Sequence, residues 1–274
     1  MTSTDSIALL GIPLDANSSH LVGPAKGPAA IRRVLHSGSG NHVSEAGVDA
    51  IGALDDLGDI EVENVAGSIL DADLITERVA EVVNTGQQLI CLGGDHSVTF
   101  PILRGFARYA EHLTVVHIDA HPDLYDDLDG NPLSHASPFA RALEAGCMQR
   151  LVQLGIRTAT PHQHEQADRW SVEMIGARAL SEFDPGSLSG PIYLTIDLDG
   201  LDPSVAPGVS HHEPGGLTFR EVLDIIDSLP GPLVGADIVE LNPDRDVVDV
   251  TAAVAAKLVK EVAGAMSQEG SKPL

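Results

Sequence analysis

Short apolar segments rich in β-branched residues alternate with longer amphipathic segments along most of the chain, and this alternation limits the fold more than any other feature. Strands that alternate with helices favour a mostly parallel sheet covered by helices on both faces. The 274 residues suit one domain of this kind, and neither an internal repeat nor a change of composition marks a second one. We therefore predict a single doubly wound α/β domain over residues 1–274.

The expected elements follow from hydrophobic period and from helix boundary signals. Segments with the character of strands are 6–14, 88–92, 113–119, 150–156, 172–175, 191–197 and 232–240. Segments with the character of helices are 28–35, 73–83, 100–110, 137–145, 162–170, 218–228 and 247–266. Ligands bind open α/β sheets at the carboxyl ends of the strands, so functional residues are expected there.

Three of the expected strands end in residues that bind metal ions. The endings are Gly93-Gly94-Asp95-His96, Asp119-Ala120-His121-Pro122-Asp123 and Asp197-Leu198-Asp199. Side chains alternate between the two faces of a strand, so Asp119, His121 and Asp123 are expected to point the same way. The same period aligns Asp197 with Asp199, and His96 would supply a second imidazole.

Four carboxylates that lie this close cannot all stay ionised without a counter-charge. Two divalent cations would neutralise them, and oxygen ligands with a few imidazoles suit Mn²⁺. A single Asp-x-Asp at a strand end is more often a turn or a cap than a metal ligand. Three such endings on three predicted strands favour a two-metal centre, which can lower the pKa of a bridging water.

Two further residues have the chemistry of a hydrolytic site. His135 lies in an expected loop twelve positions after Asp123, and a histidine near metal ions can carry a proton to a leaving amine. Glu240 ends an expected strand, and its carboxylate could pair with a planar guanidinium. On position alone, a solvated loop histidine is the more common role for His135, and Glu240 could as well be a helix-facing or loop charge.

The net charge of −24 disfavours nucleic acid and anionic membranes as partners, and it would attract a small cation. Solubility alone also explains such a charge. Two cysteines in unrelated contexts, Cys91 and Cys147, suit a reducing compartment. The first 15 residues have no basic region typical of a signal peptide, and no apolar run is long enough to cross a membrane. We therefore expect a cytoplasmic protein.

The motifs resemble those of the ureohydrolases, the family of arginases and agmatinases, over nearly the whole chain. The likeness is greatest to plant-type arginases and to agmatinase-like bacterial members. Beyond the three strand endings, it is carried by Tyr125-Asp126, Gly130-Asn131, Ser134-His135-Ala136-Ser137, Ala206-Pro207-Gly208-Val209-Ser210-His211, Glu213-Pro214-Gly215-Gly216 and Val234-Gly235-Ala236-Asp237 with Glu240.

The resemblance implies a parallel sheet of about eight strands, two Mn²⁺ per chain and assembly as a homotrimer or homohexamer. One ion would be held by His96, Asp119, Asp123 and Asp197, and the other by Asp119, His121, Asp197 and Asp199. His135 would be the proton shuttle and Glu240 would grip the guanidinium, which activated water attacks to release urea. The implied substrate contacts are Asn131, Ser134, His135, His211, Glu213 and Glu240.

The resemblance leaves the substrate tail open. Animal arginases carry an aspartate for the α-amino group after a Gly-x-Arg turn, whereas Gly155-Ile156-Arg157 is followed here by Thr158-Ala159-Thr160. Arginine is the first expectation, and agmatine or another guanidino acid is the alternative. A deacetylase-like hydrolase with one zinc and a ligand sensor without catalysis are further alternatives. The complete ligand set, with His135 and Glu240, disfavours both.

Overall fold

Eight parallel strands form one sheet in the order β2-β1-β3-β8-β7-β4-β5-β6. The computed structural model describes residues 6–38 and 40–269, so residues 1–5 of the N-terminal stretch that was compared with a signal peptide lie outside the described residues. The strands are β1 (Ile7–Ile12), β2 (Leu54–Asp59), β3 (Leu89–Gly93), β4 (Thr114–Ile118), β5 (Arg150–Ile156), β6 (Glu173–Gly176), β7 (Ile192–Asp197) and β8 (Leu233–Val239). The predicted α/β fold is confirmed.

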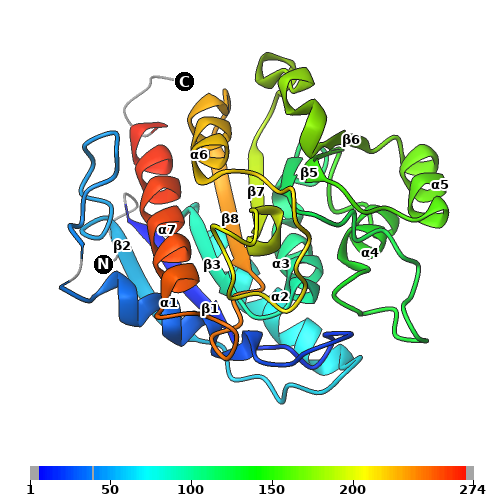
Figure 1. The fold of residues 1–274 in the computed structure, drawn as a ribbon, viewed down its shortest axis with the longest axis horizontal. Helices are drawn as coiled ribbons and strands as arrows, with labels where there is room; N and C mark the ends of the chain where they lie inside the picture. The colour runs from blue at the N-terminus through cyan, green and yellow to red at the C-terminus, as the bar shows by residue number, and fades with distance from the viewer. Residues whose placement is uncertain (1–5, 39, 270–274) are drawn as a thin grey trace.

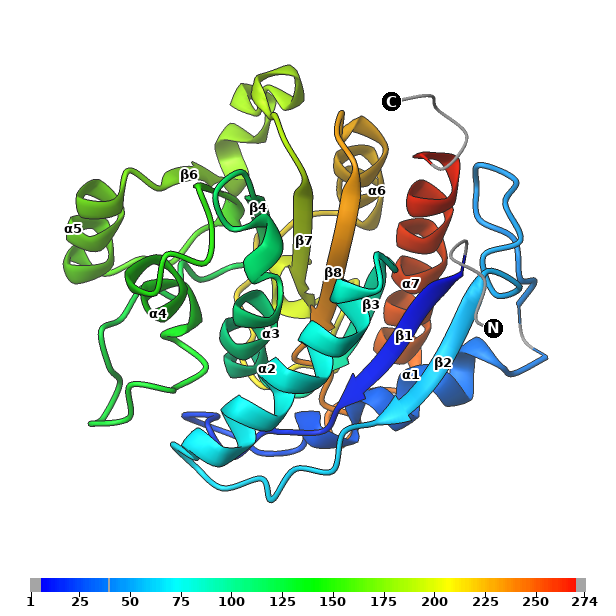
Figure 2. The same ribbon diagram turned by 180° about the vertical axis from the view of Figure 1, so that it is seen from behind.

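Helices cover both faces of the sheet (Figures 1 and 2). They are α1 (Gly27–Leu35), α2 (Ile69–Asn84), α3 (Thr99–Gly105), α4 (Pro138–Glu144), α5 (Pro161–Trp170), α6 (Phe219–Ser228) and α7 (Val250–Glu269). The apolar faces of α1, α6 and α7 bury Ile31, Leu223 and Val259 in one core layer. The opposite layer contains Ile75 of α2 and Ile102 of α3. Among the described residues, no helix combines the length and apolar character that membrane crossing requires.

The edge strand β2 was not expected from the sequence. Its residues read Leu-Asp-Asp-Leu-Gly-Asp, without a β-branched side chain, and all six are half-buried or exposed. Arg32 of α1 reaches this strand, where its Nε lies 2.9 Å from Asp56 Oδ2 and its Nη1 contacts Asp59. Pairing with β1 and this arginine, rather than apolar burial, therefore account for the strand.

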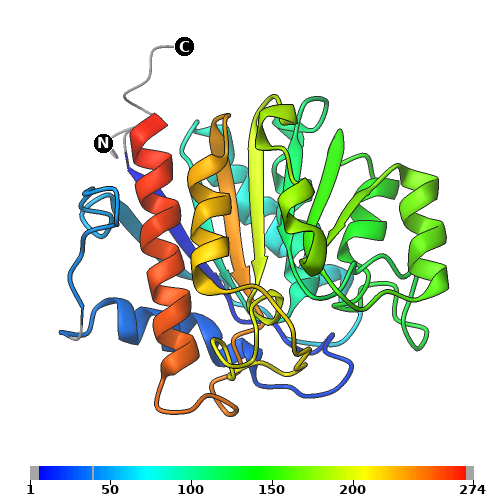
Figure 3. The ribbon, with the colours of Figure 1, turned by 45° about the horizontal axis from the view of Figure 1, so that its top comes forward.

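The carboxyl ends of β3, β8, β7 and β4 lie side by side in the middle of the sheet. Figure 3 shows β7 and β8 ending at the same edge, beside the loop that leads to α6. After β3, Gly94 passes so close to the chain that a Cβ there would lie 1.9 Å from the Leu14 carbonyl oxygen. The backbone N–H of Asp95 donates to that same oxygen at 2.8 Å. This turn carries His96 to the centre of the edge.

Candidate active site

The predicted metal ligands converge, but strand alternation is not what brings them together. β4 ends at Ile118, so Asp119 to Asp123 form a loop, in which Asp123 has a left-handed φ of 52°. Asp199 lies in a short 3-10 turn after β7, and its backbone N–H donates to Asp197 Oδ1 at 2.8 Å. The expectation that these side chains align along extended strands is therefore wrong, because turns beyond the strand ends aim them.

The first group surrounds one imidazole nitrogen. His96 Nδ1 lies 3.0 Å from Asp119 Oδ2, 3.1 Å from Asp123 Oδ2 and 3.2 Å from Asp197 Oδ2. The imidazole is fully buried, and its Nδ1 has no hydrogen-bond partner. A buried lone pair that faces three carboxylate oxygens needs a positive charge between them.

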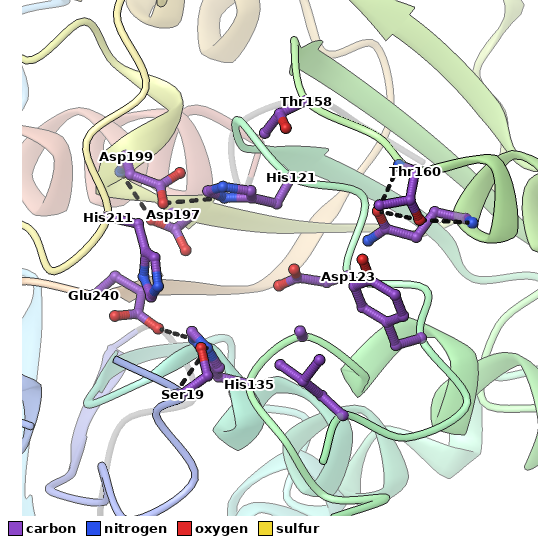
Figure 4. Close-up of a pocket in the computed structure, with 14 residues that line it drawn as sticks. Ser19, His121, Asp123, His135, Thr158, Thr160, Asp197, Asp199, His211 and Glu240 are labelled. Carbon is purple, nitrogen blue, oxygen red and sulfur yellow. Dashed lines mark hydrogen bonds and ion pairs between the residues drawn. The ribbon is translucent and has the colours of Figure 1, made fainter. Parts of the chain in front are cut away.

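The second group shares Asp119 with the first. His121 Nδ1 lies 3.2 Å from Asp199 Oδ2 and 3.4 Å from Asp119 Oδ1. Figure 4 shows His121, Asp197 and Asp199 turned toward one another. Ligand atoms of Asp119, His121 and Asp199 lie within 4.8 Å of one another, the spacing of groups that hold one ion. Because each oxygen of Asp119 serves a different group, this carboxylate is suited to bridge two ions.

A buried chain of hydroxyl groups orients His96. Thr195 Oγ1 donates to Asp237 Oδ1 at 2.6 Å and lies 3.0 Å from His96 Nε2. Since the threonine proton is used on Asp237, its oxygen accepts the Nε2–H of His96, and Nδ1 keeps its lone pair for a metal ion. Tyr193 and Thr99 also donate to Asp237.

His117 orients the bridging carboxylate, a role that the sequence interpretation missed. Its Nε2 lies 2.7 Å from Asp119 Oδ2, and Gln153 Nε2 donates to its Nδ1 at 3.0 Å. His117 and Gln153 are fully buried on the neighbouring strands β4 and β5. The signal was the His-x-Asp spacing at the end of β4, which places His117 two positions before the bridging carboxylate.

The ionisation of this centre reflects crowding of like charges. Burial and the neighbouring carboxylates Asp199 and Asp119 raise the pKa of Asp197 well above its usual range. Burial and Asp119 raise the pKa of Asp199 to about 7. Burial disfavours a charged imidazole, yet Asp199 and Asp119 outweigh it and raise the pKa of His121 to about 12. The centre thus holds negative charge that protons or cations must balance.

His135 and Glu240 form a second pair beside this centre. His135 Nδ1 lies 3.0 Å from Glu240 Oε1, which also accepts the backbone N–H of His96 at 3.0 Å. Burial opposes protonation of His135, but Glu240 outweighs it and raises the pKa of His135 to about 9. The other oxygen, Glu240 Oε2, is buried without a hydrogen-bond partner. One carboxylate oxygen is therefore free to accept a ligand.

A cavity of about 210 Å³ opens onto both groups (Figure 4). Its lining includes the ligands His121, Asp123, Asp197 and Asp199, and the pair His135 and Glu240 with His211 and Ser19. The remaining wall is uncharged and consists of Tyr125, Leu128, Ala136, Thr158, Thr160 and Gln163. Figure 4 places Thr158 and Thr160 across the cavity from Glu240.

Three expected substrate contacts, Asn131, Ser134 and Glu213, lie outside this lining. Asn131 donates to Asn17 Oδ1 at 2.9 Å and accepts the N–H of Leu133, so its side chain holds a loop. Ser134 is buried, and its hydroxyl accepts the N–H of Ala136. The carboxylate of Glu213 lies 3.9 Å from Nε2 of His121, which is one of the lining residues. Asn131 and Ser134 thus stabilise the loop before His135, and a contact of either with the substrate stays a prediction.

Comparison with known proteins decides the family. The model of the arginase family matches residues 5–264. The chain belongs to the arginase family. It is 43% identical over 279 residues to arginase 1, mitochondrial, of Arabidopsis thaliana, covering 96% of this chain and 82% of that one. It is 32% identical to the agmatinase of Bacillus anthracis, covering 93% of this chain and 90% of that one.

A solved member of the arginase family shares the fold throughout. The arginase from Medicago truncatula superposes with a TM-score of 0.88 at 42% sequence identity, covering 96% of this chain and 88% of that one. The predicted resemblance to plant-type arginases, and more distantly to agmatinases, is confirmed.

The expectation of a cytoplasmic location is wrong on this comparison. Three plant arginases at 43% identity are named mitochondrial, or chloroplastic and mitochondrial. The expectation rested partly on two cysteines that suit a reducing compartment. Cysteine usage reports redox conditions and does not distinguish one reducing compartment from another, so it could not support the choice.

Proposed function

We propose that this member of the arginase family hydrolyses L-arginine to L-ornithine and urea, with two Mn²⁺ per chain. The observation that carries the proposal is one cavity lined by ligands from both groups, by His135 and by Glu240, whose Oε2 has no hydrogen-bond partner. The identity of 43% to a plant arginase, against 32% to an agmatinase, supports arginine as the substrate and leaves agmatine as the alternative.

The ligands fit a pair of hard divalent cations. His96, Asp119, Asp123 and Asp197 would hold one ion, and Asp119, His121, Asp197 and Asp199 would hold the other. The buried Nδ1 of His96, which faces three carboxylate oxygens, supports this assignment. Four carboxylates and two imidazoles suit Mn²⁺ better than thiol-binding metals. When bound, the two ions would neutralise the carboxylates and lower the pKa of a water held between them.

Glu240 would bind the guanidinium of the substrate, and His135 would supply a proton. Glu240 Oε2 would accept two N–H groups of the guanidinium, or one of them together with a water, in a charge-assisted contact. The same carboxylate keeps His135 protonated near neutral pH, because it raises the pKa of His135 to about 9. His135 would donate that proton to the nitrogen of the departing amine, and the carbon–nitrogen bond to ornithine would break.

The uncharged wall favours arginine over agmatine. The tail of agmatine is a bare ammonium, whereas the tail of arginine carries a carboxylate as well. Thr160 lies in this wall as the N-cap of α5, at the positive end of the helix dipole, and its hydroxyl accepts the backbone N–H of Gln163. The helix dipole and the hydroxyl of Thr158 suit a carboxylate, whereas the four acidic side chains of the lining are assigned to the metal ions and to the guanidinium, namely Asp123, Asp197, Asp199 and Glu240.

The oligomeric state, the excluded partners and the alternative enzyme class stay predictions. Assembly as a homotrimer or homohexamer rests on the family resemblance. The prediction that nucleic acid and membranes are not partners rests on the charge of −24. A deacetylase-like enzyme would use one zinc ion, and it would not require both Asp123 and the second group around His121.

The experiment that tests the proposal is urea release from a substrate panel after loading with Mn²⁺. The panel is arginine, agmatine, guanidinobutyrate and free guanidine. The highest kcat/KM is expected for arginine. A preference for agmatine would show that the assigned substrate is wrong but that the urea-releasing hydrolysis is right. No urea from any of the four compounds would contradict the proposed function.

A further inference from the structure

The segment 17–19 lies over the outer nitrogen of His135. The backbone N–H of Ser19 donates to His135 Nε2 at 3.2 Å, and Ser19 Oγ lies 2.8 Å from the same nitrogen. The backbone N–H of His135 donates to the Asn17 carbonyl oxygen in return. His135 is thus bonded on both ring nitrogens, to Glu240 on one side and to Ser19 on the other (Figure 4).

A buried carboxylate anchors this segment. Asp95 Oδ2 accepts the backbone N–H of Asn17 at 3.0 Å and the hydroxyl of Ser18 at 3.2 Å. Asn17 Nδ2 also donates to Ser97 Oγ at 3.0 Å. Ser19 itself is exposed and lines the cavity, whereas His135 is 9% exposed. Ser19 therefore lies between a nearly buried imidazole and water, and the contacts of Asp95 with Asn17 and Ser18 hold the backbone that precedes it.

The two contacts of Ser19 suit both protonation states of His135. A backbone N–H is only a donor, so its contact requires a lone pair on Nε2 and places the proton of neutral His135 on Nδ1, toward Glu240. When His135 is protonated, Nε2–H donates to Ser19 Oγ instead. The hydroxyl is the one group of the pair that can both accept and donate.

We propose that Ser19 is a relay residue for His135, passing protons between Nε2 and water in the cavity mouth. The inference rests on the proposed function, since a shuttle that gives its proton to the departing amine must be reloaded. In one relay step, Ser19 Oγ takes a proton from water or a buffer acid and gives its own hydrogen to Nε2. The net result is the transfer of one proton from the water or buffer acid to Nε2, and Ser19 ends the step as a neutral hydroxyl. Ser19 acts through His135 and is a positioning residue.

The test is Ser19→Ala, which removes the hydroxyl and keeps the backbone N–H. A positioned proton-transfer group contributes about 10²- to 10⁴-fold, and loss of the relay alone should lower kcat about tenfold in weak buffer with KM unchanged. Added imidazole should restore kcat by carrying the proton. Ser19→Thr, which keeps a hydroxyl, should stay within about twofold of the unaltered protein.

Ser18→Ala is the matched comparison, because that hydroxyl bonds Asp95 and not His135. Any loss of rate there should not respond to imidazole. The inference is overturned if Ser19→Ala keeps full kcat in weak buffer, if its loss does not respond to imidazole, or if Ser18→Ala responds equally.

A second readout does not depend on activity. ¹⁵N NMR of the His135 ring above its pKa should give the Nδ1–H tautomer in the unaltered protein and in Ser19→Ala. The Nε2–H tautomer would overturn the inference even in an active enzyme. Failure of the unaltered protein to release urea, with the Nδ1–H tautomer present, would instead count against the proposed function.

Discussion

At the scale of single residues, Glu240 does three things at once. It has a left-handed φ of 66°, which is rare for a residue other than glycine and costs about 1–3 kcal/mol when surroundings enforce it. One of its oxygens binds His135 and the backbone of His96, while the other stays free in the cavity wall. This left-handed residue directly follows β8 and contributes its carboxylate to the cavity lining.

Glu240→Gln tests the role of the free oxygen. The amide keeps the shape but loses the negative charge, so the charge-assisted contact of about 1.5–3 kcal/mol should be largely lost. We expect kcat/KM for arginine to fall about 10- to 100-fold, measured as urea release at saturating Mn²⁺. Unchanged kcat/KM would contradict a contact between Glu240 and the guanidinium.

The pKa of His135 is the second prediction at this scale. Glu240 raises it to about 9, so Glu240→Gln should lower it toward the ordinary value near 6.5. Because the folded-state pKa is raised, the pair stabilises the fold below about pH 6.5, and this contribution is lost as the pH rises through about 9. NMR titration of the ring measures the pKa in both proteins, and equal values would exclude Glu240 as the cause.

Thr195 provides a third residue-scale prediction. Thr195→Val keeps the volume but removes the acceptor for His96 Nε2, so His96 is no longer held with Nδ1 toward the carboxylates. Loss of such a supporting bond costs about 10- to 100-fold in metal affinity, which calorimetric titration with Mn²⁺ would measure.

Thr114→Val is the control for Thr195→Val. Thr114 is also buried on a strand, but its hydroxyl donates to the Ser189 carbonyl oxygen, away from the ligands. Its Mn²⁺ affinity should match that of the unaltered protein. Equal losses in the two variants would show a general effect of hydroxyl removal.

At the scale of elements, periodicity predicted seven of the eight strands and all seven named helices, with boundaries shifted by a few residues. The exception, β2, lacks the apolar pattern on which such prediction depends. The expected helix 100–110 ends as α3 at Gly105 and continues as a 3-10 turn. At Gly105 a Cβ would lie 2.5 Å from Val79 of α2, so close contact between α2 and α3 requires glycine there.

The site was predictable in its residues but not in its geometry. All six proposed ligands converge, although turns rather than strand period aim them. Those turns depend on tertiary contacts such as the bond from Asp95 N–H to the Leu14 carbonyl oxygen, across 81 positions of sequence. Ser19 and His117 gave weak local signals, because their roles arise from neighbours distant in the chain.

Arg32 tests the account of β2. Its side chain is 16% exposed and contacts both Asp56 and Asp59. Arg32→Ala should lower the free energy of unfolding by about 1 kcal/mol. This cost is larger than that of losing a typical exposed ion pair, because Arg32 is largely buried and contacts two carboxylates. Arg78→Ala, which breaks an exposed pair with Glu81 on α2, should cost only a few tenths, about 0.3 kcal/mol. Urea denaturation compares the two, and equal costs would contradict the account.

At the scale of the whole molecule, the strongly acidic chain concentrates part of its charge at the one edge where four central strands end. The parallel sheet fixes those ends, the turns after them gather the carboxylates, and the cavity gives a small cation access. Bound cations would thus neutralise the carboxylates at this edge and would also supply the chemistry of the site. The raised pKa values of Asp197 and Asp199 imply that metal binding releases protons and weakens as the pH falls.

The most direct test is a titration of the metal-free protein with Mn²⁺, in which urea release from arginine is followed against ions added per chain. The account predicts that activity rises until two equivalents are bound and then stays level. Full activity at one equivalent, or no urea at any ratio, would contradict it.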